Sequence, residues 1–99
     1  GIDCGIHYID NYGNVVLDIN QKQFEELVHY RQFKIKVMRN EITAVSKNYS
    51  DVPERAPLCR FNDAGFLEIA LNRASVADLL GLRMNNSGNL HYQSIRIFF

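Results

Sequence analysis

The sequence predicts a mainly β fold: a small antiparallel, Greek-key-like β-barrel of about seven strands with one or two short helices. Apolar and polar residues alternate along most of the chain, and this is the period of a half-buried strand. Turn-forming residues separate the alternating runs at short intervals. With 99 residues, 46% of them hydrophobic, the chain can close one modest core. We therefore expect residues 1–99 to form a single domain.

The first hairpin is predicted within residues 2–19. Its first strand has apolar residues at alternate positions, namely Ile2, Cys4, Ile6 and Tyr8. Residues 11–14 supply the turn. The second strand then directs its odd-numbered residues, from Val15 to Ile19, toward the core and its even-numbered residues toward the other side.

A short helix and a second hairpin follow. Asn20 is a suitable helix N-cap, and Phe24, Leu27 and Val28 share one face of the helix that it begins. The next strand alternates over residues 33–37, and a turn at residues 39–41 leads to a partner strand at residues 42–45. A loop is expected at residues 46–57.

The last third of the chain contains a third hairpin and a closing strand. Strands at residues 58–61 and 66–71 flank an NDAG turn, in which Gly65 supplies a permissive backbone. Ser75 can cap a second short helix that holds Val76, Leu79 and Leu80. After the polar turn at residues 85–89, a closing strand alternates over residues 94–99.

Composition and charge disfavour several classes of protein. The 11 basic and 11 acidic residues balance, which disfavours nucleic-acid partners and anionic membrane surfaces. No apolar run reaches the roughly 20 residues of a membrane helix. Cys4 and Cys59 are too few and too distant for a disulfide scaffold, so we expect a reduced, cytoplasmic setting. Gly1 begins directly in a strand-like pattern, which we interpret as the start of an excised domain.

The residues by themselves predict little catalytic chemistry. Cys4 and His7 are an odd number of positions apart in one strand, so they face opposite sides and cannot share a metal. Neither cysteine has a histidine in a catalytic pattern, and both are interpreted as core residues. The glycines of NYGN and DAGF lack the spacing of phosphate-binding loops. We predict no metal site and no catalytic residue in this chain.

Two polar residues near the first turn suggest a binding site. Asp10 follows Ile2, Cys4, Ile6 and Tyr8 in parity, so its carboxylate should emerge at the rim of the face that those residues bury. Asn14 should lie nearby across the turn. A carboxylate and an amide side by side can bind an ammonium group and the edge of a heterocycle. The alternative is that both residues only stabilise the turn.

Two motifs resemble those of a known family. The first is IDNYGN at residues 9–14, and the second is NDAGFLEIA at residues 62–70, where Asp63 occupies a position that is typically serine. The loop around Tyr49 and the stretch ADLLGL at residues 77–82 are also similar. Together they resemble the C-terminal domain of the S-adenosyl-L-methionine (SAM) hydroxide adenosyltransferases, or SAM hydrolases, and of the related fluorinase.

The resemblance implies a two-domain enzyme of which this barrel is the C-terminal part. A larger N-terminal α/β domain, absent from this chain, would carry the residues that handle water, and trimers would form active sites between subunits. Water or hydroxide would attack the ribose C5′ of SAM and release adenosine and L-methionine. SAM is the substrate, and no further cofactor is implied.

The resemblance also assigns a substrate-binding set. Asp10 matches the residue that receives the methionine ammonium group, and Asn14 matches the amide that contacts an adenine edge. Tyr12 and Tyr49 match aromatic positions of the adenosine pocket. The full implied set comprises Asp10, Tyr12, Asn14, Tyr49, Asn62, Asp63 and Arg73.

The carboxylate of Asp63 is compatible with more than one ligand and more than one binding pose. An ionised carboxylate there would repel the substrate carboxylate and attract its ammonium group. The substrate could shift, the side chain could turn away, or the ligand could be another adenosyl compound. An alternative of a different class is a non-catalytic oligomerisation barrel whose pocket is lost or altered. An oligonucleotide-binding barrel is disfavoured because Lys34, Lys36 and Arg96 are too sparse.

Overall fold

The computed structural model describes residues 1–37, 39–71, 75–77 and 94–99. The described residues form seven strands, an α-helix and a 3₁₀ turn, which confirms the predicted fold class. The strands are β1 (Ile2–Ile9), β2 (Val15–Asn20), β3 (Lys34–Val37), β4 (Asn40–Ile42), β5 (Pro57–Phe61), β6 (Phe66–Leu71) and β7 (Ser94–Phe98). The helix α1 is Gln21–Val28, and the 3₁₀ turn η1 is Tyr49–Asp51.

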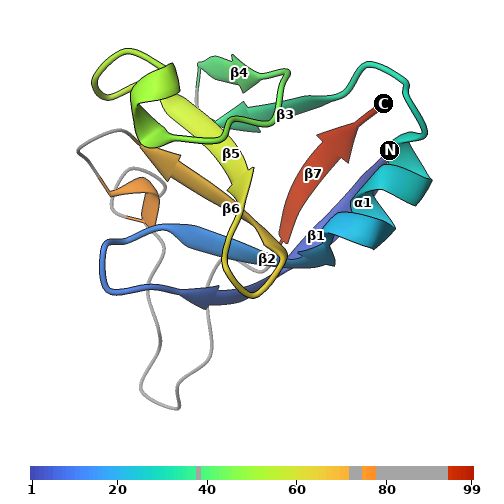
Figure 1. The fold of residues 1–99 in the computed structure, drawn as a ribbon, viewed down its shortest axis with the longest axis horizontal. Helices are drawn as coiled ribbons and strands as arrows, with labels where there is room; N and C mark the ends of the chain where they lie inside the picture. The colour runs from blue at the N-terminus through green and yellow to red at the C-terminus, as the bar shows by residue number, and fades with distance from the viewer. Residues whose placement is uncertain (38, 72–74, 78–93) are drawn as a thin grey trace.

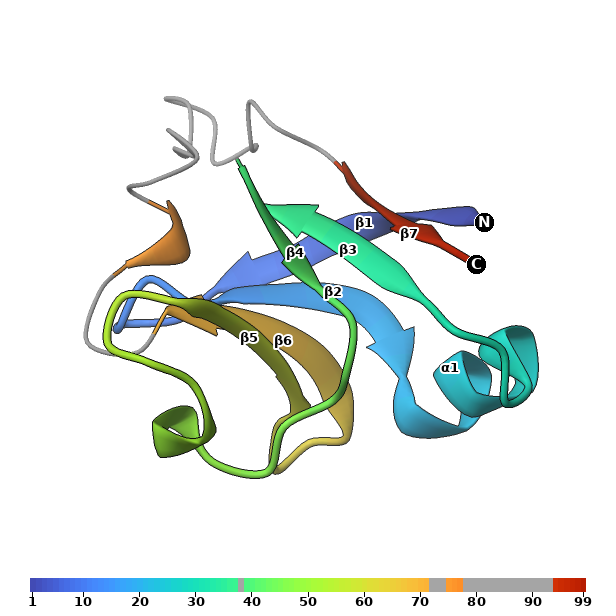
Figure 2. The ribbon, with the colours of Figure 1, turned by 90° about the horizontal axis from the view of Figure 1, so that it is seen from above.

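The seven described strands form one antiparallel sheet in the order β4-β3-β7-β1-β2-β6-β5. The sheet curls so strongly that its two end strands approach each other (Figures 1 and 2). An isolated parallel bridge between Val45 and Cys59 links the segment after β4 to β5. The result is a nearly closed barrel, in which few strand edges remain unpaired.

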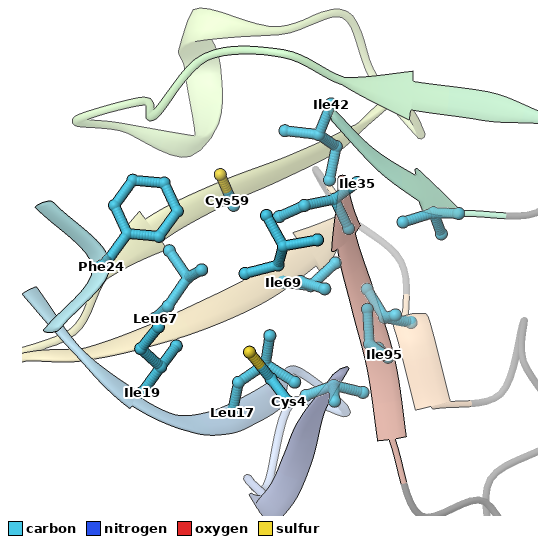
Figure 3. Packing of buried hydrophobic residues seen from close by; sticks show 14 of the residues in the cluster. Cys4, Leu17, Ile19, Phe24, Ile35, Ile42, Cys59, Leu67, Ile69 and Ile95 are labelled. Atoms are coloured by element: carbon cyan, nitrogen blue, oxygen red, sulfur yellow. The ribbon is translucent and has the colours of Figure 1, made fainter. Parts of the chain in front are cut away.

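One continuous apolar core fills the barrel (Figure 3). Ile35, Leu67, Ile69 and Ile97 have no measurable exposure and come from β3, β6 and β7. Both cysteines belong to this core and are free thiols, as the sequence predicted. The alternation seen in the sequence therefore corresponds to an inner face of buried side chains.

Helix α1 closes one end of the barrel. Asn20 caps it as predicted: its side chain accepts from Gln23 N, and the Gln23 side chain accepts from Asn20 N. Phe24 packs edge-on against Phe33 and Phe61. Leu27, predicted to share the face of Phe24, borders a cavity of about 410 Å³ beside β1 and β2 and remains 39% exposed.

The predicted hairpins are confirmed, with small changes in their limits. Asn40 already pairs with Val37, so the second strand of that hairpin begins earlier than the sequence indicated. Gly65 has a φ of +86°, the left-handed value expected for the NDAG turn. Most of the second predicted helix, with Leu79 and Leu80, and the turn at residues 85–89 lie outside the described residues.

A bulge in β1 changes which side chains face the core. Ile6 lies opposite Leu17, but Tyr8 lies opposite Val16 because the register shifts between them. Tyr8 is therefore on the face away from the core and is 42% exposed. The predicted parity of Tyr8 with Cys4 and Ile6 was wrong because an extra residue in a strand reverses the alternation beyond it.

Candidate ligand-binding site

The turn between β1 and β2 is organised by the Asp10 carboxylate. Its Oδ1 accepts from the backbone N–H of Tyr12 at 2.9 Å and of Asn14 at 3.0 Å. Its Oδ2 accepts from Asn14 Nδ2 at 3.0 Å. Asp10 and Asn14 thus lie side by side, as predicted. Asn14 is only 5% exposed, so its amide is held in a nearly dry position.

Gly13 lets this turn pack closely against residues 75–77. It has a φ of +79°, and a Cβ at this position would collide with the Ser75 side chain. The Gly13 carbonyl also accepts from Ala77 N at 2.9 Å. A side chain at residue 13 would therefore disturb the turn that carries Asp10 and Asn14.

Strand pairing places a row of larger side chains on the outer face of the barrel wall. Tyr8, Val16, Glu68 and Arg60 lie opposite one another across β1, β2, β6 and β5. The next row, which ends at Cys59, faces the core. Asp10 was predicted at the rim of the inner face, but the β1 bulge brings it to the outer side with this row.

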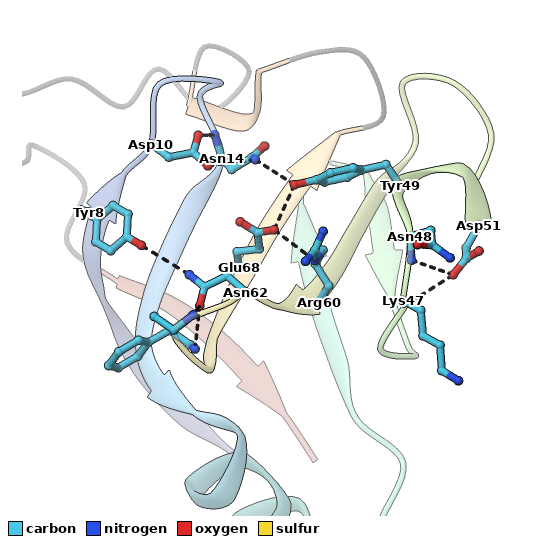
Figure 4. A network of polar contacts seen from close by, with 12 residues as sticks. Tyr8, Asp10, Asn14, Lys47, Asn48, Tyr49, Asp51, Arg60, Asn62 and Glu68 are labelled. Carbon is cyan, nitrogen blue, oxygen red and sulfur yellow. Dashed lines mark hydrogen bonds and ion pairs between the residues drawn. The ribbon is translucent and has the colours of Figure 1, made fainter.

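Tyr49 connects the first turn to this row (Figure 4). Its hydroxyl donates to Glu68 Oε1 at 3.1 Å and accepts from Asn14 Nδ2 at 3.4 Å. Arg60 places its guanidinium 5.2 Å from the centre of the Tyr49 ring. Asp10, Asn14 and Tyr49, three of the predicted site residues, are therefore in one hydrogen-bonded network.

Glu68 is the most buried charged group of this network. It is 4% exposed, and its outer-face neighbours Val16 and Ala70 are apolar and buried. Arg60 Nε lies 3.3 Å from Glu68 Oε1 as an ion pair. Burial raises the pKa of Glu68, although the Tyr49 hydroxyl and Arg60 act in the opposite direction. The pKa of Tyr49 is also raised, first by burial and then by the Glu68 charge.

The second motif forms a turn beside the same face. Asn62 Oδ1 accepts from the backbone N–H groups of Ala64 and Phe66, each at 3.0 Å. Asn62 Nδ2 donates to the Tyr8 hydroxyl at 3.4 Å. Asp63 is exposed at the tip of this turn. Asn62 therefore holds the NDAG backbone and reaches the outer face, while Asp63 leaves its carboxylate in solvent.

No side-chain hydrogen bond among the described residues places the other four predicted site residues in the network. Asn62 and Asp63 lie in the NDAG turn. Tyr12 contributes its backbone N–H to Asp10, but its ring is 81% exposed. Arg73 lies outside the described residues. The sequence reasoning also missed Glu68 and Arg60 as members of the site. An ionisable residue inside the apolar run from Leu67 to Leu71 was the available signal, because a buried charge requires a partner.

Other potential sites have little support among the described residues. No group of three or more histidine, cysteine, aspartate or glutamate side chains in this part of the chain could hold a metal ion. The described part also contains no helix that is long and apolar enough to cross a membrane. Burial raises the pKa of the Cys4 thiol to about 11 and that of Cys59 to about 12, so neither is a ready nucleophile.

Comparison with known proteins identifies the family. The family described as the SAM hydroxide adenosyltransferase C-terminal domain matches residues 4–87, which include the first turn, Tyr49, Arg60 and Glu68. The chain belongs to this family. The resemblance found in the two motifs is thereby confirmed, and the polar network lies within the matched part of the SAM hydroxide adenosyltransferase domain.

Individual relatives are similar over different lengths. The (R)-S-adenosyl-L-methionine hydrolase of Thermus thermophilus is 44% identical over 39 residues, which are 39% of this chain and 15% of that protein. An uncharacterised conserved protein from Thermotoga maritima is 27% identical, with a TM-score of 0.71 over 98% of this domain and 35% of its own chain. A conserved hypothetical protein from Thermus thermophilus shares the fold, with a TM-score of 0.63, 23% identity and 99% and 34% coverage. The SAM hydroxide adenosyltransferase domain thus spans about a third of the solved structures it resembles.

Proposed function

We propose that this chain is the substrate-recognition and trimer-assembly domain of an enzyme that hydrolyses SAM to adenosine and L-methionine. The observation that carries the proposal is the Asp10 carboxylate, held 3.0 Å from the Asn14 amide in the first family motif. This pair offers a negative charge to an ammonium group and an amide to a purine edge. The SAM hydrolase relative supports the same substrate class.

Five of the predicted site residues have the following roles in this proposal. Asp10 binds the methionine ammonium group, since Oδ2 accepts only one hydrogen bond from the described residues and can accept another. Asn14 binds an edge of adenine. Tyr49 offers a ring face to the adenosyl group. Tyr12 and Arg73 complete the adenosine pocket, where Tyr12 turns its exposed ring over the bound ligand.

The reaction itself requires a second domain. The sulfonium of SAM is a good leaving group, so catalysis chiefly requires orientation of a water or hydroxide toward C5′ and exclusion of bulk solvent. We propose that an N-terminal α/β domain and neighbouring subunits of a homotrimer supply the residues for this step. In this cytoplasmic enzyme the barrel contributes binding and orientation, with no cofactor besides the substrate.

Asp63 determines how the methionine end is bound. Its exposed carboxylate repels the substrate carboxylate, so methionine is oriented with its ammonium group toward Asp10 and with its carboxylate away from Asp63. Replacing Asp63 by serine in the full-length protein is expected to leave SAM affinity unchanged or to improve it. A tenfold weaker affinity in calorimetric titration would contradict this arrangement.

Adenosine release from SAM tests the function directly. The full-length protein is incubated with SAM, and adenosine and methionine are quantified by chromatography. Equal amounts of both products are expected, and a trimer is expected by light scattering. A protein that releases no adenosine would instead be a non-catalytic assembly barrel. That alternative is favoured by the exposed aromatic rings Tyr30 and Phe98, which resemble interface residues.

A further inference from the structure

The Arg60 guanidinium has unused hydrogen-bond donors within the network. A guanidinium carries five N–H donors and no acceptor. Its Nε lies 3.3 Å from Glu68 Oε1 as an ion pair, yet this buried nitrogen makes no hydrogen bond among the described residues. The other described partner of Arg60 is the Tyr49 ring, and no described residue accepts a hydrogen bond from its terminal amino groups. These amino groups are therefore available to a ligand.

Two contacts hold the guanidinium in place beside the candidate site (Figure 4). Its Cζ lies 5.2 Å from the centre of the Tyr49 ring, and the Glu68 carboxylate pairs with its Nε edge. The Arg60 side chain is 24% exposed, so it is neither fully buried nor free in solvent. A planar guanidinium that is already held in one orientation loses little conformational entropy when it binds an anion.

This cation lies among carboxylates. After burial, which raises the pKa of Glu68 most, the charges of Asp10 and Asp63 raise it further, so both carboxylates are near Glu68. The charge of Arg60 lowers the same pKa. A negatively charged group of a ligand is therefore attracted to Arg60 and repelled by the other charges of this cluster.

The methionine end of SAM has one negatively charged group, its carboxylate. In the proposed function Asp10 binds the ammonium group, whereas the carboxylate is repelled by Asp63 and has no partner. The ammonium and the carboxylate are attached to the same carbon, so their binding groups have to lie in one small region. Asp10 and Arg60 meet this condition, because they belong to one network whose contacts are between 3.0 and 3.4 Å.

We propose that Arg60 binds the carboxylate of the methionine end of SAM through its terminal amino groups. The flat, forked guanidinium matches the two oxygens of a carboxylate. Arg60 thereby supplies the carboxylate contact that Asp63 cannot make. This inference rests on the proposed function and deepens it, because it adds a residue that selects adenosyl compounds with an intact amino-acid end.

Decarboxylated SAM tests this contact on the side of the ligand. It has the adenosyl group, the sulfonium and the ammonium of SAM but lacks the carboxylate. The full-length protein is incubated with each compound, and kcat/KM is measured from adenosine release. We expect kcat/KM to be roughly tenfold or more higher for SAM, because hydrogen bonds between charged groups are lost with the decarboxylated compound.

Substitutions of Arg60 test the contact on the side of the protein. Arg60→Met removes the guanidinium, and the preference for SAM is expected to fall to within roughly threefold. Arg60→Lys keeps the charge without the fork and is expected to keep part of the preference. Because Arg60→Met leaves Glu68 without its ion-pair partner, the double variant Arg60→Met, Glu68→Gln repeats the test without a buried unpaired charge.

A matched arginine and a smaller ligand separate carboxylate recognition from folding. Arg96 also pairs with a carboxylate, that of Asp3 at 3.1 Å, and also lies over an aromatic ring, that of Phe98, but on β7. Arg96→Met is expected to keep the wild-type preference. Adenosine lacks the methionine end, so calorimetric titration is expected to give dissociation constants within roughly threefold of the wild type in every variant.

Three results would overturn the inference while SAM hydrolysis stands. One is a wild type that uses both compounds equally well, and another is a preference that persists in Arg60→Met and in the double variant. The third is a loss of adenosine affinity as large as the loss of preference, which would show that Arg60 only supports the Tyr49 ring. If the wild type releases no adenosine from SAM, the proposed function itself is wrong, and this inference is wrong with it. A preference that falls in Arg60→Met but not in Arg96→Met, with adenosine binding retained, supports the inference.

Discussion

Replacing Gly13 by alanine is expected to lower the free energy of unfolding by about 2–5 kcal/mol. Gly13 has a left-handed φ of +79°, where a Cβ costs about 1–2 kcal/mol. A Cβ would also lie 2.6 Å from Ser75 Cβ. Relief requires residues 75–77 to move, which breaks the 2.9 Å bond from Ala77 N to the Gly13 carbonyl. Overpacking of this kind costs about 1–3 kcal/mol more.

Gly65→Ala is the matched control. Gly65 has a similar φ of +86°, but no atom of the described residues lies within 4 Å of a Cβ built there. Its replacement should cost only the conformational term of about 1–2 kcal/mol. Urea unfolding of the 99-residue chain measures both losses. Equal losses in the two variants would refute the argument that close packing on Ser75 requires glycine at residue 13.

Three further predictions concern the network and the core. Asp10→Asn is expected to weaken SAM binding by roughly tenfold or more, because the charge for the ammonium group is lost; an unchanged titration would contradict this role. Burial raises the pKa of Glu68 above its ordinary value of 4.5, so the stability of the wild type relative to Glu68→Gln should fall as pH rises from that value through the folded pKa. If urea unfolding gives the same stability difference between the wild type and Glu68→Gln across this pH range, the predicted pH dependence is wrong. The thiols of Cys4 and Cys59 should react with a disulfide reagent at pH 8 only after unfolding, and rapid labelling of the native chain would show that they are accessible.

Local patterns predicted the elements of this fold well. The capping residue Asn20 and the left-handed Gly65 are determined by neighbouring atoms, so the sequence is sufficient to find them. The inward positions of Leu17 and Ile97 follow from alternation. Each of these predictions depends on contacts within a few residues or on the period of a strand.

The site was only partly predictable, because most of its contacts join residues that are far apart in the sequence. The pairing of Asp10 with Asn14 is local to one turn and was expected. The contact between Asn14 and Tyr49 joins residues 35 positions apart, and that between Tyr49 and Glu68 joins residues 19 positions apart. Such contacts depend on how β2, β6 and the loop before β5 pack, which a single sequence does not encode in any local pattern.

By itself, the sequence determined a small β-barrel, the core-facing side of most strands and the family whose motifs it carries. The tertiary structure alone decided which face holds the polar network. No residue pattern predicted the β1 bulge, which places Tyr8 on the outer side of the barrel. Strand pairing then aligns Glu68 and Arg60 with it. The physical reason is that a one-residue shift of register reverses every later side chain, so the position of the site depends on long-range pairing.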